Sequence, residues 1–398
     1  MSAEKGSQSK KWHPVTSKVV NRIPPSGIRK YFDMLATMDD VITLGVGEPD
    51  FATPWHISEA AVKSLEKGYT MYTSNSGMPE LREELARYME ANIGLKYDPV
   101  SEILITVGVS EGLDLVMRAI LNPGDEVVVP EPCYVSYAAC VTLAGGTPIM
   151  VVTSAENDFE VSAQIIEAAV TPRTRAILIG YPSNPTGAVL SRRQLEEIAD
   201  VARRHDLIVV SDEIYAKLVY GVEHPYIASL PGMRERTVFL GGFSKAYAMT
   251  GWRVAYAAGH HQIIAAMTKI HQYTMLCAPI MSQIAAIEAL RTGDDSAAKM
   301  LEEYNRRRIV IVKGFNEIGM PCFNPRGAFY AFPSIKHTGM TSEEFAEKLL
   351  MEEKVACVPG TAFGQCGEGH LRCCYATSMD NIEIALERIG NFMSRYGK

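Results

Sequence analysis

The sequence lacks any long hydrophobic run and any excess of positive charge. No window approaches the roughly 18 apolar residues of a membrane-spanning helix, and the polar first twenty residues lack the apolar core of a signal peptide. The net charge is −7, which gives no general attraction for nucleic acids or anionic membranes. We therefore expect a cytoplasmic protein whose partners are small molecules, with no nucleic acid and no membrane among them.

The sequence also lacks the cysteine patterns of metal sites and disulfide frameworks. Its eight cysteines are scattered, with no C-x-x-C pair and no histidine at zinc spacing. We expect reduced thiols in the core and no metal site. Cys373 and Cys374 are adjacent, so we expect them to point to the two faces of one strand.

Short apolar segments that alternate with helical patterns fill the chain from about residue 55 to about residue 290. Six segments lack polar alternation, as strands buried on both faces do; they are 103–107, 126–129, 176–179, 207–211, 238–240 and 254–257. A helix is expected at 191–205, with Ser191 as its N-cap. This alternation predicts an α/β fold with a mostly parallel sheet, covered by helices on both sides, that binds its ligands at the carboxyl ends of the strands.

The two ends of the chain depart from this pattern. A charged helical stretch at 301–318 precedes strand candidates at 328–332 and 355–358 and a final helix from about Asn381. We predict a large domain at 55–290 and a smaller α/β domain that combines 21–54 with 291–398. Residues 1–20 are polar and are expected to form a disordered tail.

The stretch GVSEG (108–112), between a strand and a helix, allows two interpretations. Its G-x-S-x-G spacing matches the nucleophile elbow of serine hydrolases, which would make Ser110 a nucleophile. The start of a helix also binds phosphate well, because its first amides are unpaired and the helix dipole favours an anion. A hydrolase would need an acid and a histidine in chain order, and no histidine lies in a distinctive motif. We favour phosphate binding, and the hydrolase stays an alternative.

Three further motifs follow predicted strands: YPSNPTG (181–187), SDEIY (211–215) and GGFSKAYAMTGWR (241–253). Together with GVSEG, and in this order, they resemble the pyridoxal-phosphate-dependent aminotransferases of fold type I, class I/II, in the aspartate and aromatic aminotransferase group. The resemblance extends from LGVGEPDFATP (44–54) to GEGHLRCCYA (367–376). The segments SGIRK and GAFYAFPSI are most similar to those of archaeal aromatic aminotransferases and bacterial N-acetyl-diaminopimelate aminotransferases.

The resemblance implies a large α/β/α domain, a smaller α/β domain and pyridoxal 5'-phosphate as cofactor. Lys245 would bind the cofactor covalently and, once displaced, act as a base, which burial assists by lowering its pKa. Asp212 ends an apolar strand, where an unpaired carboxylate is costly; it would pair with the ring nitrogen. The other implied cofactor contacts are Asn184 and Tyr215 at the phenolic oxygen, Tyr134 on the ring, and Val109, Ser110, Ser244 and Arg253 at the phosphate.

The resemblance also implies how substrate and partner subunit are bound. Arg372 would hold the α-carboxylate of the substrate, with Gly47 and Asn184 assisting. Tyr72 would reach the phosphate of the neighbouring subunit, which implies a homodimer with shared sites. The implied reaction is a ping-pong transfer of an amino group from an L-amino acid to a 2-oxo acid, for which we expect 2-oxoglutarate.

The sequence departs from the pattern of aspartate-specific relatives where the side chain of the substrate would bind. Aspartate-specific relatives hold the distal carboxylate with a lysine in the phosphate loop or with an arginine of the partner. Here the loop has Ser110, and the matching segment HQYTM (271–275) contains no arginine. We expect aromatic substrates first and aspartate or another acidic amino acid second, with Arg29 or Lys30 as a substitute cation. A carbon–sulfur or other lyase that uses the same Lys245 stays an alternative.

Overall fold

A seven-stranded sheet forms the centre of the larger part of the computed structural model, which describes residues 16–25, 27, 38 and 40–397. Its strands are β2 (Ile103–Thr106), β3 (Glu126–Glu131), β4 (Thr147–Val152), β5 (Thr174–Ile179), β6 (Ile208–Asp212), β7 (Thr237–Gly242) and β8 (Ala255–Ala258). Their order in the sheet is β2-β8-β7-β6-β5-β3-β4. Only β8 runs antiparallel to its neighbours, β2 and β7, so the mostly parallel sheet is confirmed.

All six predicted central strands are present, with ends that shift by up to two residues, and a seventh strand was missed. That strand, β4, pairs only with β3 and has partly exposed side chains. An edge strand lacks the fully buried apolar run that identified the other six strands.

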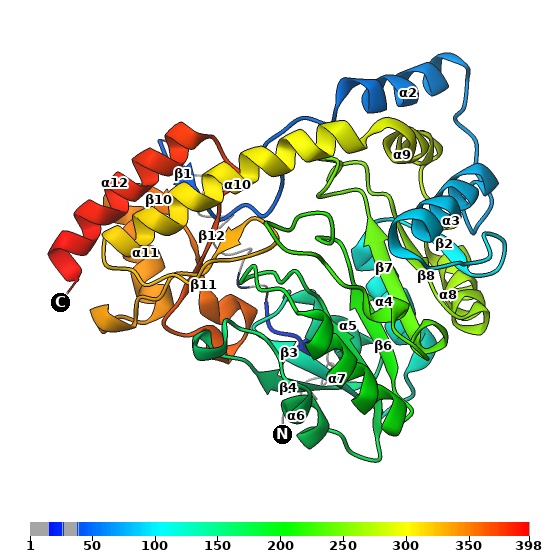
Figure 1. The fold of residues 1–398 in the computed structure, drawn as a ribbon, viewed down its shortest axis with the longest axis horizontal. Helices are drawn as coiled ribbons and strands as arrows, with labels where there is room; N and C mark the ends of the chain where they lie inside the picture. The colour runs from blue at the N-terminus through cyan, green and yellow to red at the C-terminus, as the bar shows by residue number, and fades with distance from the viewer. Residues whose placement is uncertain (1–15, 26, 28–37, 39, 398) are drawn as a thin grey trace, which may run out of the picture.

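Helices cover both faces of this sheet (Figure 1). Val127 and Val129 of β3 pack with α4 (Val109–Ile120), α5 (Ser136–Leu143) and α8 (His261–Thr274). The intervening Val128 points to a second core that includes α6 (Ala163–Ala168) and α7 (Arg192–Arg204). Helices α2 (Trp55–Glu66), α3 (Pro79–Ile93) and α9 (Ile280–Thr292) enclose a third core against β2, β7 and β8. Helix α7 begins with the predicted Ser191 cap, which forms a capping box with Gln194.

The C-terminal part forms a separate core with two small sheets. Strand β1 (Ile42–Thr43) pairs in parallel with β10 (Val355–Ala356), and β12 (Leu371–Cys374) lies between β11 (Val358–Pro359) and β9 (Tyr330–Ala331). Helices α10 (Asp294–Glu317), α11 (Ser342–Glu353) and α12 (Met379–Tyr396) pack around them, and α10 spans the distance between the two parts of the molecule (Figure 1). The pairing of β1 with β10 supports the predicted two-domain division, whose boundaries stay a prediction.

Short 3-10 helices connect these elements. They are η1 (Val20–Arg22), η2 (Ala155–Asn157), η3 (Ile227–Ser229), η4 (Arg234–Arg236), η5 (Lys336–Thr338), η6 (Gly360–Phe363) and η7 (Gln365–Gly367). Of the predicted disordered tail, residues 1–15 lie outside the described residues, and Val20 belongs to η1.

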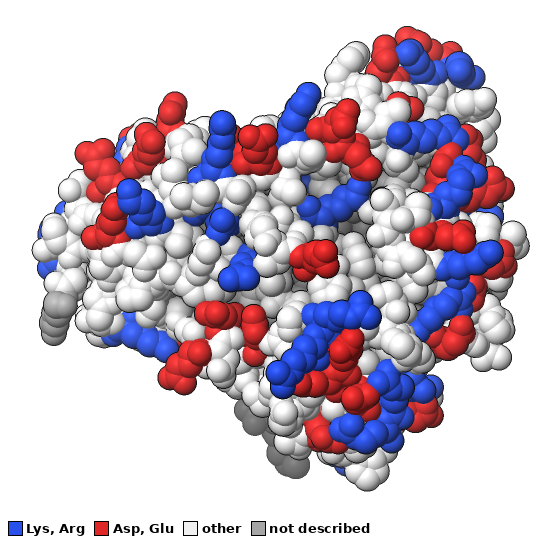
Figure 2. Space-filling view, in the orientation of Figure 1, with Lys and Arg blue, Asp and Glu red and all other residues white. Residues whose placement is uncertain are grey.

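The thiols are free, and the surface carries charges of both signs (Figure 2). All eight cysteines are free, and Cys373 and Cys374 occupy the same buried strand, as expected. Six of the eight are buried, whereas Cys277 and Cys366 are half-buried, so the core location is wrong for these two. Lysine and arginine are interspersed with aspartate and glutamate on the face shown in Figure 2. In the described part of the chain, no helix is long and apolar enough to cross a membrane, and no group of three or more metal-ligating side chains is present.

Candidate active site

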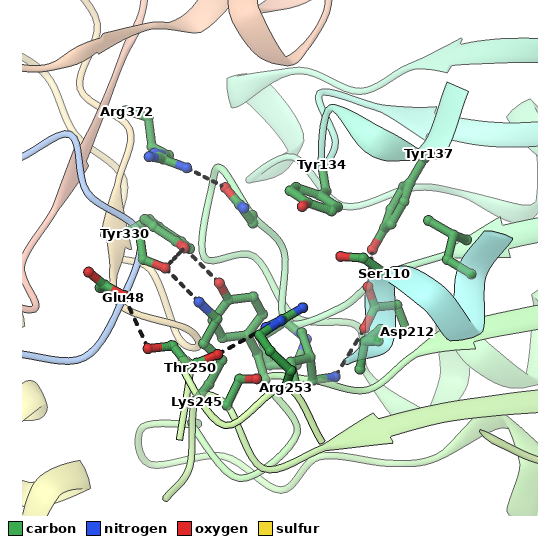
Figure 3. Close-up of a pocket in the computed structure, with 18 residues that line it drawn as sticks. Glu48, Ser110, Tyr134, Tyr137, Asp212, Lys245, Thr250, Arg253, Tyr330 and Arg372 are labelled. Carbon is green, nitrogen blue, oxygen red and sulfur yellow. Dashed lines mark hydrogen bonds between the residues drawn. The ribbon is translucent and has the colours of Figure 1, made fainter. Parts of the chain in front are cut away.

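A cavity of about 330 Å³ lies where the larger part of the molecule meets the C-terminal part (Figure 3). It is at the carboxyl ends of the parallel strands, because β6 ends at Asp212 and the segment after β7 supplies Ser244 and Lys245. Eleven of the twelve predicted site residues line it: Gly47, Val109, Ser110, Tyr134, Asn184, Asp212, Tyr215, Ser244, Lys245, Arg253 and Arg372. Tyr72 does not, and its side chain is 79% exposed.

The side chain of Lys245 points into this cavity. Its Nζ donates a hydrogen bond to the backbone oxygen of Gly47 at 2.6 Å, and it lies 5.9 Å from the centre of the Tyr215 ring. Burial lowers the pKa of Lys245 to about 8, and the nearby charge of Arg372 acts in the same direction. A lysine with such a pKa has an appreciable neutral fraction near neutral pH, which a nucleophile or base requires.

Asp212 is a buried carboxylate that has only neutral hydrogen-bond donors around it. Tyr137 donates to its Oδ2 at 2.8 Å, and the backbone N–H of Ile214 donates to its Oδ1 at 3.1 Å. Burial raises the pKa of Asp212 to about 6. Within the described residues Asp212 forms no ion pair, so a cation in the cavity would satisfy it.

Arg372 is a buried cation without a carboxylate partner in the described part of the chain. One terminal nitrogen donates to Oδ1 of Asn184 at 3.1 Å and the other to the backbone oxygen of Gly45 at 2.5 Å. Its Nε has no hydrogen-bond partner, and the guanidinium packs over the rings of Tyr330 and Phe363. An anionic ligand would remove the cost of this unpaired buried charge.

The N-terminus of α4 forms the opposite wall with Arg253. Gly108 precedes the helix with a φ of 82°, and no side chain caps the first turn. A Cβ at position 108 would lie 2.3 Å from a terminal nitrogen of Arg253. Arg253 close to the uncapped start of α4, beside Ser110 and Ser244, is an arrangement that can bind a phosphate group.

Two tyrosines on the cavity wall were not predicted from the sequence. Tyr137 contacts Asp212, and the hydroxyl of Tyr330 lies 2.6 Å from the hydroxyl of Tyr215. Tyr137 comes three residues after Tyr134, about one helical turn, and this spacing could have indicated it. Tyr330 lies in the GAFYAFPSI segment, whose resemblance to relatives assigned no role to this side chain.

Ser110 has no histidine near it on the cavity wall, as far as the chain is described. The described cavity wall therefore lacks the histidine that the Ser-His-acid hydrolase interpretation requires, and the position of Ser110 in the first turn of α4 favours the phosphate interpretation.

Comparison with known proteins gives consistent matches along the chain. A family model described as aminotransferase class I and II matches residues 39–389. YugH of Bacillus subtilis (strain 168), whose name gives an expected aminotransferase activity and no substrate, is 55% identical over 379 residues, which are 95% of this chain and 98% of that protein. An aspartate aminotransferase of Pyrococcus abyssi (strain GE5 / Orsay) is 48% identical over 370 residues, covering 92% of this chain and 95% of that protein. The crystal structure of an aromatic aminotransferase from Pyrococcus horikoshii OT3 superposes with a TM-score of 0.88 at 45% identity, covering 92% of this chain and 99% of that chain.

Proposed function

Because this chain belongs to the class I and II aminotransferases, we propose that it uses pyridoxal 5'-phosphate to move an amino group between an L-amino acid and a 2-oxo acid, with Lys245 as the central catalytic residue. The observation that carries the proposal is the arrangement of Lys245 in one cavity with a buried anion, Asp212, and a buried cation, Arg372. Each of these two buried charges lacks a partner of opposite sign in the described chain. Bound groups that bring a cation to Asp212 and an anion to Arg372 would supply the missing partners.

The donors and charges of the cavity fit this cofactor. The first turn of α4, Ser244 and Arg253 would hold its phosphate, and Asp212 would pair with its protonated ring nitrogen. Asn184 and Tyr215 would hydrogen-bond the phenolic oxygen, and Tyr134 would pack on the ring. When bound, pyridoxal phosphate supplies the aldehyde that takes up the amino group and an electron-withdrawing ring that acidifies the Cα–H of the substrate.

The side chains of the protein would then bind the substrate and move a proton. Arg372, with Asn184 beside it, binds the α-carboxylate and so fixes the orientation of the Cα–H. The neutral amine of Lys245 takes the proton from Cα of the substrate. The lowered pKa of Lys245, about 8, favours this neutral form. The backbone oxygen of Gly47, which accepts from Nζ at 2.6 Å, keeps the amine on this side of the cavity.

We propose a ping-pong cycle with 2-oxoglutarate as the amino acceptor and aromatic amino acids as the first substrates to test. The lining includes apolar and aromatic side chains that could contact an aromatic substrate, among them Leu113, Ile214 and Tyr330. In the described chain, the cations on the wall are Lys245, Arg253 and Arg372, all of which have other roles in this proposal. Arg29 and Lys30 lie outside the described residues, and aspartate or another acidic amino acid is the second class to test.

We also propose a homodimer in which Tyr72 completes the phosphate site of the partner. Exposed apolar side chains gather on two segments, Met71 with Tyr72 and Tyr273 with Met275. A hydrogen bond of 2.7 Å from Asn75 to the backbone oxygen of Leu276 holds these segments together. An exposed apolar patch of this kind favours burial against a second copy of the chain. The cytoplasmic location stays a prediction.

The absorption spectrum of the purified protein, taken before and after adding single amino acids without a 2-oxo acid, tests the proposal. A lysine-linked chromophore that converts to the amino form of the cofactor with particular amino acids would support it and rank the substrates. Multiple turnovers that release pyruvate or ammonia would instead favour the lyase. No chromophore after incubation with pyridoxal phosphate would refute the proposal.

A further inference from the structure

Tyr137 makes a single side-chain hydrogen bond in the described structure, and its acceptor is Asp212. The phenol is 5% exposed and donates to Oδ2 at 2.8 Å. Figure 3 shows its ring above Asp212 with the hydroxyl directed at the carboxylate. Burial, and then the charge of Asp212, raise the pKa of Tyr137 well above 10. The hydroxyl therefore keeps its proton and acts toward the carboxylate only as a donor.

The missing side chain of Gly180 leaves space for this hydroxyl. Gly180 directly follows β5, and a Cβ at that position would lie 2.0 Å from the Tyr137 hydroxyl oxygen and 3.0 Å from the ring carbon that bears it. The φ of Gly180 is outside the left-handed region, so backbone conformation does not require glycine there. The space that the Tyr137 hydroxyl occupies does require it.

We propose that Tyr137, with its hydroxyl seated in the gap at Gly180, is a positioning residue that keeps Asp212 an anion facing the ring nitrogen of the cofactor. The inference rests on the proposed function, because the ring nitrogen is present only with the cofactor. A hydrogen bond donated to a carboxylate stabilises its charged form. Without it the carboxylate becomes more basic and draws the proton from the ring nitrogen to itself.

The other groups that face Asp212 do not replace this donor. Ile214 donates from its backbone to the other oxygen, Oδ1. The charge of the neighbouring Glu213 disfavours the anion, and Lys245 favours it through its charge alone. Because Lys245 would be linked to the cofactor in the resting enzyme, Tyr137 is then the side chain that holds Oδ2.

Tyr137→Phe and Gly180→Ala test this inference in two independent ways. The first removes the hydroxyl, and the second keeps it but fills its place. Each holoprotein is prepared with pyridoxal phosphate labelled with 15N in the ring, and the 15N chemical shift reports whether that nitrogen carries a proton. The dissociation constant of the cofactor is measured in parallel. Tyr181→Phe is the matched control, since Tyr181 is a buried tyrosine that donates to the backbone oxygen of Phe159 at 3.1 Å and does not contact Asp212.

We expect both variants to shift the 15N signal toward the unprotonated form and to weaken cofactor binding by about tenfold or more, the usual effect of losing a hydrogen bond to a buried charge. Tyr181→Phe should keep the wild-type signal. The double variant should lie close to Tyr137→Phe, because the hydroxyl oxygen 2.0 Å from the added methyl group is already gone and only the ring carbon at 3.0 Å must still move slightly.

An unchanged 15N signal in Tyr137→Phe, in a protein that still forms the lysine-linked chromophore, would overturn the inference and leave the proposed function intact. A shift in Tyr137→Phe without one in Gly180→Ala would overturn the role of the gap. If the wild-type protein forms no lysine-linked chromophore, the proposed function fails and the inference falls with it.

Discussion

Arg372 donates a hydrogen bond of 3.1 Å to the side-chain oxygen of Asn184, although 188 positions separate the two residues in the sequence. The contact joins β12 of the C-terminal part to the loop after β5. It directs the guanidinium into the cavity, where Nε has no partner. The proposed carboxylate site is therefore built by two parts of the molecule together.

Arg372→Lys should weaken substrate use. Lysine keeps the charge but lacks the planar donor fork that binds a carboxylate through two parallel hydrogen bonds. We expect kcat/KM for the preferred amino acid to fall by about a hundredfold, or about 3 kcal/mol, mostly through KM. Steady-state kinetics measure this. Arg193→Lys, on the exposed surface of α7, is the control, and an unchanged KM in Arg372→Lys would exclude the proposed role.

Lys245→Ala and Lys245→Arg should both abolish turnover. Alanine removes the amine, and arginine stays protonated, so neither can accept a proton from Cα. We expect a loss of at least about a thousandfold, with an unchanged circular dichroism spectrum. Transamination near the wild-type rate in either variant would refute the mechanism.

Gly108→Ala should weaken cofactor binding more than its backbone strain explains. The new Cβ would lie 2.3 Å from a terminal nitrogen of Arg253 and push the guanidinium away. Gly319→Ala is a control for the positive φ, because Gly319 has the same φ of 82° but no atom within 4 Å of an added Cβ. We expect Gly319→Ala to lose about 1 kcal/mol of stability and Gly108→Ala to lose more, because Gly108 also has a ψ of 161°, which residues other than glycine rarely combine with a positive φ. Only Gly108→Ala should weaken cofactor binding, by about tenfold; equal dissociation constants in the two variants would contradict the phosphate site.

Mixing inactive Tyr72→Phe and Lys245→Ala proteins should restore activity if sites are shared. In each heterodimer, one site then receives both an intact Lys245 and the partner's intact Tyr72. Random exchange makes about half of the dimers mixed, so the ceiling is about a quarter of wild-type activity. Subunit exchange is confirmed separately by native mass spectrometry. No recovery after confirmed exchange would argue against shared sites.

His370 should make the protein less stable in acid. Its ring is 3% exposed and stacks on Phe332 with centres 5.1 Å apart. Burial, and then the charge of Lys336, lower the pKa of His370 to about 4 from 6.5. Below pH 6.5 the unfolded chain binds a proton that the folded chain does not, so stability is lost as the pH falls from about 6.5 to about 4.

His370→Gln removes this contribution. Between pH 7 and pH 4 the wild-type protein should lose up to about 3 kcal/mol more unfolding free energy than the variant. Urea titrations at several pH values measure the difference. His261→Gln, at the exposed start of α8, serves as control. Parallel pH profiles for the wild-type protein and His370→Gln would show that His370 does not contribute.

The local sequence determined much of the fold and most of the candidate site. Apolar runs identified six central strands, and the Ser191 cap marked the beginning of α7. Lys245, Asp212 and Asn184 follow or end predicted strands, and parallel strands bring such positions to one edge of a sheet. These features depend on residues that are neighbours along the chain, so they could be predicted from a single sequence.

Only the tertiary structure decided which distant residues meet. Strand β4 was missed because its burial depends on its place at the edge of the sheet, and the reversed direction of β8 depends on its neighbours β2 and β7. Tyr137 was missed because its role depends on contacts with two residues distant in the sequence. These are Asp212, which ends β6, and Gly180, which follows β5. The packing of separate elements creates these contacts. The sequence alone therefore determined the type of chemistry, and the tertiary structure decided which side chains surround the reacting groups.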